Sequence, residues 1–394
     1  GRSGGIAKGD ISLLYDRNGG TATNATIASL TKTSGGALTG GETTIRAHLM
    51  ISGIPSGVET IEILPFDSFS IFDASDNSML DTETTGDLKL KAGPKQGLTN
   101  LKRYYVSTNG NNNNDGRSEA TAWRNIDYGT SRIPAGSILY IKKGIYQGEY
   151  ISFTNNGTKA APIVIEGYNN TPGDRPTISG FNEKSSFNPN KMPLLDGRNR
   201  KMGTAISLHK KSYIAVRNLQ ITEYSVGIMG FGANNLHVED NILTNFGDRD
   251  AKYAGVGIKL GATNLSHYNK IISNTVINAA AEQIYVYGSN NLIRDNTVIG
   301  SDNSTGHKSA PDYYLGLGKN SHHNHVDANT LIRVGNLKHP GHGVSGKGDN
   351  TFNLYTNNTV TNLGSGTGGR HRGSKNNTYK NNTLIDCVMA LNLR

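Results

Sequence analysis

The sequence predicts an all-β protein with two parts, a small antiparallel β-sandwich over residues 1–100 and a long stack of repeated coils over residues 101–394. Gly accounts for 49 of 394 residues and only 35% of the residues are hydrophobic, which suits short strands joined by turns better than long helices. Apolar residues alternate with polar ones over short segments in both parts. From residue 269 onward an asparagine motif recurs at intervals typical of solenoid repeats.

The first 100 residues contain alternating segments separated by GG, SG and DN turns. Thr43–Ile51, Thr60–Leu64 and Asp87–Leu90 are each typical of a strand in an antiparallel sandwich. Part of this region, GVETIEILPFDSFSIFDASDNSMLDTETTGDLKL, resembles a small accessory domain found beside extracellular enzymes. We expect a binding or spacer module, with a simple linker as the alternative. The Gly- and Pro-containing stretch 92–101 predicts the boundary between the two parts.

From Arg103 the sequence changes to short strands separated by Gly and Asn. The segments GSILYIKKGIYQG (136–148), APIVIEG (161–167) and PTISG (176–180) follow one another at short intervals. This opening resembles the first coils of right-handed parallel β-helix proteins of the pectate-lyase type. The resemblance implies a right-handed parallel β-helix for residues 101–394.

The motif Asn-x4-Asn-Thr indicates how the coils repeat. It begins at residues 269, 291, 324, 353 and 377, so the copies lie 22, 33, 29 and 24 residues apart, and a degenerate copy spans 235–241. Unequal intervals indicate loops of different length leaving a constant coil. Asn tolerates left-handed backbone geometry at a corner, and its amide can bond to the Asn above and below. We therefore predict a vertical ladder of asparagines.

Counting from the repeat predicts a column of cations. Lys319, Lys347 and Arg372 lie five, six and five residues before their repeat asparagines, and successive coils are separated by about 4.8 Å. Other basic side chains lie beside this column: Lys338, His339, His342, Arg370 and His371. Because stacked like charges repel unless an anion lies over them, the pattern favours a cleft for a polyanion over surface decoration.

The overall charge limits the class of partner. A formal charge of +9 favours an acidic polymer, with plain solubility as the alternative. The sequence contains no basic run interleaved with aromatic residues, the pattern that indicates nucleic-acid binding. No apolar run approaches the roughly 18 residues of a membrane span. Cys387 is the only cysteine, which excludes an intrachain disulfide and a cysteine-based metal site.

The cationic stretch carries the residue types that β-elimination of an acidic polysaccharide requires. The reaction needs a group that neutralises the uronate carboxylate, a base for the C5 proton and a donor for the leaving oxygen. Cations crowded around a lysine lower the pKa of its ammonium, so that it can act as a base, and Arg can hold a carboxylate while donating.

Residues 343–384 carry a resemblance to a family of such enzymes. The segment GVSGKGDNTFNLYTNNTVTNLGSGTGGRHRGSKNNTYKNNTL is similar to the catalytic coils of polysaccharide lyase family six. The resemblance implies that Lys347 is the base and Arg370 the acid. The family places two acidic calcium ligands before the lysine, where this chain has Pro340 and His342. No cofactor is therefore assigned, calcium stays open, and His342, His339 or Lys338 is expected to neutralise the carboxylate.

A second resemblance nominates a different base. GIKLGA (257–262), followed by His267, resembles the region around the base lysine of family-nine pectate lyases, which points to Lys259. The calcium-binding Asp cluster of that family is not evident in EYSVGI (223–228), so Lys259 ranks below Lys347 and is assigned to substrate binding.

Other side chains have alternative interpretations, and strand alternation would place His323 and His325 on one face. His322, His323 and His325 are coil-packing residues or, for His323, a substrate contact, with a transition metal as a third interpretation. Tyr313 and Tyr314 belong to a packed loop or reach a sugar ring; we assign Tyr314 to substrate binding. Asp248, Asp250 and Asp312 are the carboxylates that a glycosidase would use.

The sequence thus predicts a lyase for an acidic, uronate-containing and possibly sulfated polysaccharide. Such a substrate places it in a secreted, periplasmic or cell-surface setting, although the chain opens on GRSGG without an export leader. The alternatives are a hydrolase of a sulfated glycan and a non-catalytic glycan-binding β-helix.

Overall fold

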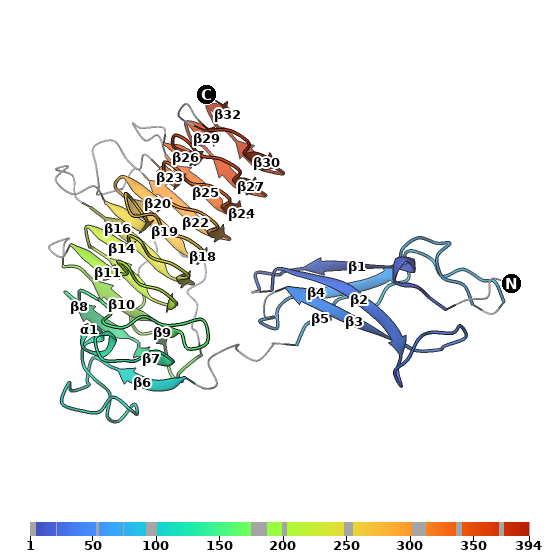
Figure 1. Cartoon of the computed structure of the whole chain (residues 1–394), viewed down its shortest axis with the longest axis horizontal. Coiled ribbons are helices and arrows are strands. Elements are labelled where there is room, and N and C mark those ends of the chain that lie inside the picture. Colours follow the sequence, from blue (N-terminus) through green and yellow to red (C-terminus); the bar gives the residue numbers. More distant parts are fainter. Residues whose placement is uncertain are drawn as a thin grey trace. The chain divides into compact units, whose positions relative to one another are not determined.

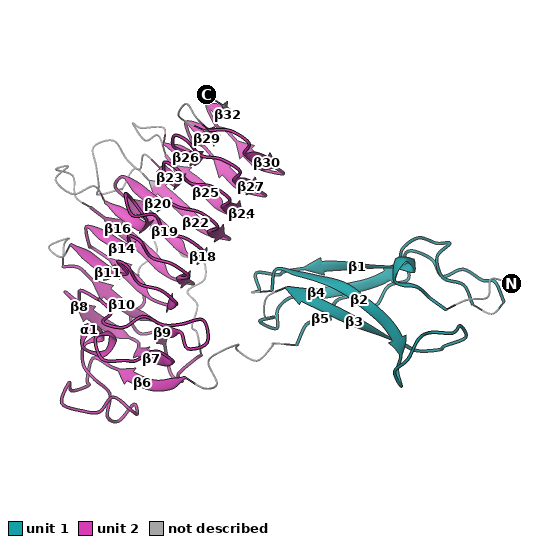
Figure 2. Ribbon diagram, in the orientation of Figure 1, with its two compact units in different colours: residues 1–99 teal, residues 100–394 magenta. Residues whose placement is uncertain are grey.

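The computed structural model describes residues 5–20, 22–52, 55–73, 75–91, 101–174, 187–198, 203–247, 255–301, 313–335, 341–369 and 374–393. The chain divides into two compact units, Gly1–Thr99 and Asn100–Arg394 (Figure 2). Nearly all of the predicted boundary stretch, residues 92–100, lies outside the described residues. Each unit is described by itself.

The first unit contains two antiparallel sheets on one small core. Strands β1 (Ile11–Asp16), β4 (Thr60–Pro65) and β5 (Leu88–Lys89) form one sheet, and β2 (Asn24–Lys32) pairs with β3 (Ile45–Ser52) in the other. A short 3-10 turn, η1 (Lys8–Asp10), precedes β1. Ala25, Ile61 and Leu90 form the core, with side chains from β1 and β3 packed against it. Alternating burial along β3 is the pattern that predicted this sandwich.

A buried carboxylate holds the turns of this unit together. Glu59 accepts hydrogen bonds from the backbone N–H groups of Ala22, Ser56 and Gly57 at 2.8 to 3.0 Å. Burial raises the pKa of the Glu59 carboxyl, but the backbone donors lower it by more, to about 2. Glu59 is therefore ionised in the folded unit and ties strand β4 to the loop before β2.

The second unit is a parallel β-helix of three sheets. Figure 1 shows its coils stacked from β6 to β32. We name each sheet by its first strand. The β6 sheet contains β6 (Lys102–Val106), β7 (Ser137–Lys142), β9 (Ile163–Tyr168), β12 (Ile214–Arg217), β15 (His237–Glu239), β18 (Lys270–Ile272), β21 (Leu292–Arg294), β24 (His325–Asp327), β27 (Leu354–Thr356) and β30 (Thr378–Lys380).

The other two sheets complete each coil. The β8 sheet contains β8 (Gly144–Gln147), β10 (Pro193–Asp196), β13 (Gln220–Thr222), β16 (Ile242–Phe246), β19 (Thr275–Ala279), β22 (Thr297–Ser301), β25 (Thr330–Val334), β28 (Thr359–Thr361) and β31 (Thr383–Ile385). The β11 sheet contains β11 (Thr204–Ser207), β14 (Val226–Gly230), β17 (Val256–Leu260), β20 (Glu282–Val286), β23 (Tyr313–Leu317), β26 (His342–Gly346), β29 (Ser365–Gly369) and β32 (Met389–Leu393).

Apolar side chains fill the interior of the helix in register. Ile228, Ile258, Ile284, Leu315 and Val344 pair one above another along the β11 sheet and are all fully buried. The short helix α1 (Ile126–Thr130) packs beside β6 and β7 at the first coil and contributes Ile126 to the same core. Among the described residues, no helix has the length and apolar character that a membrane crossing requires.

The asparagine motif forms two parallel ladders. In one, Asn269, Asn291, Asn324, Asn353 and Asn377 each bond to the next through Nδ2 and Oδ1 at 2.9 to 3.1 Å. In the other, Asn241, Asn274, Asn296, Asn329, Asn358 and Asn382 do the same. The predicted ladder is thus confirmed and doubled.

Two details of the prediction were wrong. The left-handed residue at each corner directly precedes the ladder asparagine: Asn290, for example, has φ 58° and Asp295 φ 55°. The degenerate copy was aligned at Asn235, but the amide of Leu236 bonds to Asn269 Oδ1, so Leu236 holds the first ladder position of that coil. Only its second position, Asn241, carries an asparagine in the ladder.

Candidate functional site

The outer face of the β11 sheet carries the polar groups of interest. Three rows of residues flank the buried columns of Ile258 and Leu260. One row contains Val256, Glu282, Tyr313, His342 and Ser365; the next contains Lys259, Tyr285, Gly316, Ser345 and Gly368; the third follows the strand ends with Gly261, Tyr287, Gly318 and Lys347. Parallel pairing places each member about 4.8 Å from the next. We call these rows the outer face.

Three tyrosines form the centre of the outer face. The rings of Tyr285 and Tyr313 lie 5.2 Å apart, edge to face, and those of Tyr285 and Tyr287 lie 5.2 Å apart. A Cβ added at Gly316 would lie 2.4 Å from the Tyr285 ring, and one added at Gly318 would lie 2.1 Å from the Tyr287 ring. The two glycines on β23 and directly after it therefore give the rings of the preceding coil room to lie against the backbone.

Burial controls the protonation of these phenols. It raises the pKa of the Tyr285 hydroxyl far above its usual range, and Tyr287, Tyr313 and Glu282 add to the shift. Burial and the Glu282 charge also raise the pKa of Tyr287, although its contact with Tyr285 works in the opposite direction. Both phenols are consequently O–H donors at neutral pH, not phenolates.

Lys259 lies beside this cluster in an ion pair. Its Nζ is 2.6 Å from Glu282 Oε2 on the next coil and lies 5.6 and 5.7 Å from the ring centroids of Tyr285 and Tyr287. Both members of the pair are largely buried, with side-chain exposures of 18% and 19%. An ammonium in such a pair offers no free lone pair. Lys259 is therefore better suited to holding the tyrosines and a substrate anion than to removing a proton.

Lys347 and His342 lie on the other side of the tyrosines. The side chain of Lys347 is exposed, and its Nζ lies 5.7 Å from the Tyr313 ring centroid. The ring of His342 lies 5.5 Å from that of Tyr313, and its Nδ1 is 2.8 Å from Ser365 Oγ. The structure therefore brings together Lys259, His342 and Lys347 from the predicted set. Tyr313, between them, had been considered for contact with a sugar ring, whereas Tyr285 and Tyr287 had not.

The predicted cation column is wrong in its register. Leu317, two residues before Lys319, pairs with Gly346, the residue directly before Lys347. Lys319 therefore lies one position beyond Lys347, and its Nζ is 3.5 Å from Asp349 in an exposed ion pair. It borders the outer face on the neighbouring coil without stacking on Lys347. The paired residues Leu317 and Gly346 both precede their repeat asparagines by seven, so offsets of five and six already separate Lys319 and Lys347 by one position.

Tyr314 does not contact a substrate, contrary to the prediction. Its side chain is fully buried and belongs to the apolar core of the helix. Tyr313, the adjacent residue on β23, carries its ring on the outer face instead. Tyr314 and the next residue, Leu315, both belong to the core, so simple alternation does not hold at this point of the strand and could not tell which tyrosine faces outward.

The histidine-rich segment lies away from the outer face. His323 occupies a corner with φ 55°, and its ring stacks on Phe352 at 5.3 Å. This corner precedes the β6 sheet, so His323 is not part of the cluster around Lys347. Alternation had placed His323 and His325 on one face, but the left-handed corner interrupts that alternation.

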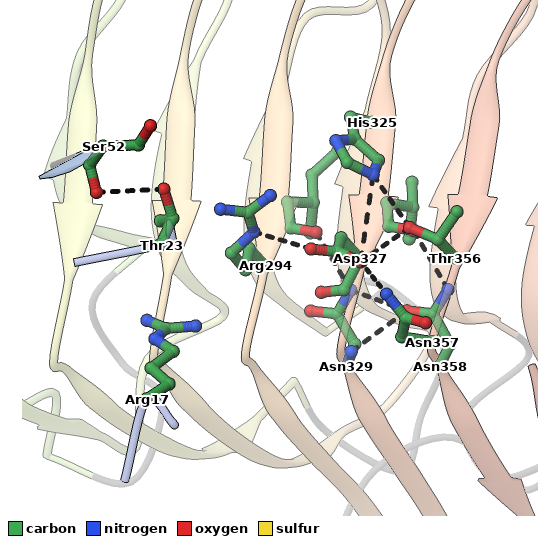
Figure 3. A network of polar contacts seen from close by, with 12 residues as sticks. Arg17, Thr23, Ser52, Arg294, His325, Asp327, Asn329, Thr356, Asn357 and Asn358 are labelled. Carbon is green, nitrogen blue, oxygen red and sulfur yellow. Dashed lines mark hydrogen bonds and ion pairs between the residues drawn. The ribbon is translucent and has the colours of Figure 1, made fainter. Parts of the chain in front are cut away.

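His325 belongs to a polar network on the β6 sheet (Figure 3). Asp327 lies 2.8 Å from Arg294 Nε and accepts hydrogen bonds from Thr356 Oγ1 and Asn357 Nδ2 at 2.6 and 2.9 Å. Burial raises the pKa of the Asp327 carboxyl, but these donors and Arg294 lower it by more. Burial lowers the pKa of His325. His325, Asp327, Arg294 and Thr356 each have a partner within the network, which supports the coil-packing interpretation.

Several predicted residues lie outside the described residues: Lys338, His339, Arg370, His371, Arg372, Pro340, Asp248, Asp250 and Asp312. Their assignments stay predictions. The described residue directly before Arg370, Gly369, pairs with Gly346, the residue directly before Lys347. In the described part of the chain, no three His, Cys, Asp or Glu side chains are grouped closely enough to bind a metal ion.

Sequence reasoning missed Glu282, Tyr285 and Tyr287. The segments GIKL (257–260), QIYV (283–286), YLGL (314–317) and GVSG (343–346) occupy equivalent positions in consecutive coils. Aligning them by their inward-facing apolar residues would have placed Lys259 beside Tyr285. The signal was therefore present in the strand segments and absent from the asparagine motif.

Comparison with known proteins establishes the fold. Residues 198–331 match the family described as "Right handed beta helix region". The second unit is therefore a right-handed parallel β-helix, as predicted. No curated protein sequence matches the chain.

Solved structures with a similar fold differ in the activity their names give. A rhamnogalacturonan lyase is 13% identical over 72% of this chain and 74% of its own, with a TM-score of 0.49. The pectate lyase Pel9A is 14% identical over 70% of each chain, with a TM-score of 0.47. A GH136 lacto-N-biosidase from Eubacterium ramulus is 13% identical over 72% and 57%, with a TM-score of 0.46. At these identities the likeness concerns the fold alone.

Proposed function

We propose that the chain is a polysaccharide lyase that cleaves an acidic, uronate-containing polysaccharide by β-elimination on the outer face of the β11 sheet. The observation that carries this proposal is the exposed ammonium of Lys347 over the Tyr313 ring, with the His342 ring 5.5 Å from that same ring. Because such a polymer is met outside the cytoplasm, the proposal includes a secreted, periplasmic or cell-surface setting.

The charges of the outer face suit an anionic sugar. Lys347 forms no ion pair within the described part of the chain, whereas Lys259 is neutralised by Glu282 and Lys319 by Asp349. An unpaired ammonium above a buried aromatic floor attracts a carboxylate, and the half-buried Tyr287 ring presents a surface to a sugar ring. The described side chains thus combine a cation with an apolar platform.

The proposed step is a β-elimination in which one proton leaves the sugar ring and another is added to the leaving oxygen. Lys347 first gives a proton to water, and its neutral amine then removes the C5 proton of the uronate. The electron pair forms the C4–C5 double bond as the C4–O bond breaks, and the leaving oxygen takes a proton. Resemblance assigns that proton to Arg370. His342 neutralises the uronate carboxylate, which makes the C5 proton acidic.

A glycoside hydrolase is less well supported on this face. Hydrolysis of a glycosidic bond ordinarily requires two carboxyl groups, at a separation of about 5 to 10 Å. Within the described strands of the β11 sheet, Glu282 is the only acidic residue, and it is committed to Lys259. Asp248, Asp250 and Asp312, the other carboxylates considered, lie outside the described residues.

The test uses a panel of pectate, alginate, glycosaminoglycan, ulvan and fucoidan substrates read by ultraviolet absorbance, because a lyase creates an unsaturated sugar. We expect absorbance to rise with at least one uronate polymer. Lys347→Ala and Arg370→Ala should each reduce turnover by at least about 100-fold without loss of folding. Lys270→Ala, an exposed lysine on the β6 sheet, is the matched control and should retain activity.

Three outcomes would contradict the proposal. New reducing ends without absorbance would indicate a hydrolase. Binding without any product would indicate a non-catalytic glycan-binding protein. Full activity in Lys347→Ala would move the base elsewhere, and Lys259→Ala would then be tested next.

A further inference from the structure

Two adjoining hollows lie at the first coil of the helix, away from Lys347. Their volumes are about 450 and 420 Å³, and Asn125, Gln147 and Glu149 line both of them. Arg124 and Arg198 also line the first hollow, and Asp127 and Tyr128 of α1 also line the second. Because they share a wall, we treat them as one feature, the first-coil groove.

The carboxylates that line the first-coil groove accept hydrogen bonds from the protein itself. Glu149 is buried, and its carboxylate accepts hydrogen bonds from Asn125 Nδ2 at 2.7 Å and from the Asp127 backbone N–H at 3.2 Å. Asp127 accepts from the backbone N–H of Ser152 at 3.2 Å. These contacts tie α1 to the turn after β8. The carboxylates therefore do not pair with the arginines of the groove.

The two arginines carry positive charge that no described residue neutralises. Both side chains are exposed, and neither guanidinium forms an ion pair or hydrogen bond with the described residues. Arg198 is held in place by its backbone, which has φ 56° and donates its N–H to Asp196 Oδ1 at 2.9 Å. A guanidinium fork without a partner is a receptor for a carboxylate or sulfate group.

The rim of the groove adds apolar surface. Ile145 and Tyr150 are 48% and 47% exposed, and each lines one of the two hollows. An exposed tyrosine beside polar side chains offers a face on which a sugar ring packs. Arg132, which also lines the second hollow, stacks on Tyr128 with 3.4 Å between its Cζ and the ring centroid.

Register places this groove in line with the outer face. Ile151 pairs with Ile206, and the same column continues through Ile228 and Ile258 to Ile284. Glu149 lies two residues before Ile151, as Glu282 lies two before Ile284. Four strand spacings of about 4.8 Å therefore separate the groove from Glu282, a distance of roughly 19 Å along the helix axis. A chain of several sugars running parallel to the axis would span both.

We infer that the first-coil groove is a distal binding site for an acidic sugar residue of the polysaccharide that the outer face cleaves, with Arg124 and Arg198 as its anion receptors. The inference rests on the proposed function for the identity of the ligand. It assigns the groove a role in affinity and chain-length preference, with no part in the chemical step.

The test compares binding of a polymer in the presence and absence of the two arginines. The parent is the full chain with Lys347→Ala, so that substrate is not consumed. To it are added Arg124→Ala and Arg198→Asn, since Asn tolerates the left-handed backbone at position 198. Arg103→Ala, an exposed arginine on β6, is the matched control. Affinity electrophoresis in gels containing polygalacturonate, alginate, chondroitin sulfate or a neutral β-glucan measures the dissociation constants.

We expect the two substitutions together to weaken binding of at least one acidic polymer by about tenfold or more, the loss of roughly one charged hydrogen-bonded contact. The Arg103→Ala control and the neutral glucan should show no change. In the active chain, the same substitutions should raise KM for the polymer and leave turnover of a trisaccharide unchanged. Acidic-polymer affinities within twofold of the parent would overturn the inference.

The two proposals fail separately. If no polymer yields unsaturated product but the arginine substitutions still weaken binding, the lyase assignment is wrong and the distal site stands. If product forms and the substitutions leave affinity and KM unchanged in a chain whose thermal unfolding matches the parent, the distal site is wrong and the lyase assignment stands.

Discussion

Replacing Asn296 with alanine tests the physical basis of the coil. Its Oδ1 accepts hydrogen bonds from the backbone N–H and the Nδ2 of Asn274, at 3.0 and 3.1 Å. Its Nδ2 lies 2.9 Å from Ile271 O, 3.0 Å from Arg294 O and 2.9 Å from Asn329 Oδ1. The side chain is fully buried, so water cannot replace these partners. Asn296→Ala therefore leaves groups on three coils without a partner.

The expected cost follows from counting these contacts. Two accepted bonds and two well-formed donated bonds are lost, because the amide carries only two hydrogens. At about 1 kcal/mol each the loss is about 4 kcal/mol, and the buried N–H of Asn274 is left unpaired. We expect the free energy of unfolding to fall by about 3 to 5 kcal/mol. For a unit of this size that corresponds to a drop in Tm on the order of 10 °C.

The measurement is urea and thermal unfolding of the full chain, with hydrogen exchange of residues 270–300 to localise the effect. Asn113→Ala is the control, since its side chain is exposed and forms no described hydrogen bond, and it should change stability by less than about 0.5 kcal/mol. Asn382→Ala, at the half-buried last position of the same ladder, should cost less than Asn296→Ala because that side chain makes fewer bonds. Equal, small losses for Asn296 and Asn113 would refute the view that the ladder stabilises the coil.

Three further changes test other parts of the chain. Gly318→Ala should displace the Tyr287 ring, since the new Cβ would lie 2.1 Å from Cδ1; we expect a loss of about 1 to 3 kcal/mol by thermal unfolding and reduced turnover. Glu59 has a pKa of about 2 in the folded first unit against an ordinary 4.5, so its stabilisation is complete above about pH 4.5 and disappears as the pH falls towards 2. Urea unfolding as a function of pH should show this loss, worth about 2 to 3 kcal/mol, and Glu59→Gln should remove the pH dependence. Asp327→Ala should destabilise the helix by about 2 to 4 kcal/mol, because it leaves the largely buried Arg294 charge without its partner. Unchanged stability in urea unfolding would mean that the network does not contribute to the free energy of unfolding.

The asparagine motif predicted the coil because the residues that form each corner are close together in the sequence. The corner residue before each ladder asparagine and the amide itself lie in the same short segment, so the pattern survives any change in loop length. The ladder also continues through every coil from 269 to 382 without interruption. A sequence pattern that repeats for one physical reason is therefore a dependable guide to stacking.

The outer face could not be predicted from the same motif. Leu260, Val286 and Leu317 occupy one column, yet they precede their ladder asparagines by nine, five and seven residues. A fixed offset from the asparagine therefore points to a different position in each coil. This is why Tyr285 and Tyr287 were not recognised beside Lys259, whereas Lys319 was misplaced because offsets of five and six residues were treated as equal.

The sequence by itself determined the all-β class, the repeat, the asparagine ladder and the positive character of residues 319–375. Each of these depends on residue types and spacings within a single coil. Only the tertiary structure decided which side chains of different coils meet: the Lys259–Glu282 pair, the tyrosines between Lys259 and Lys347, the burial of Tyr314 and the first-coil groove. Contacts between coils depend on strand register, and register is set by the packing of buried apolar columns through loops of unequal length.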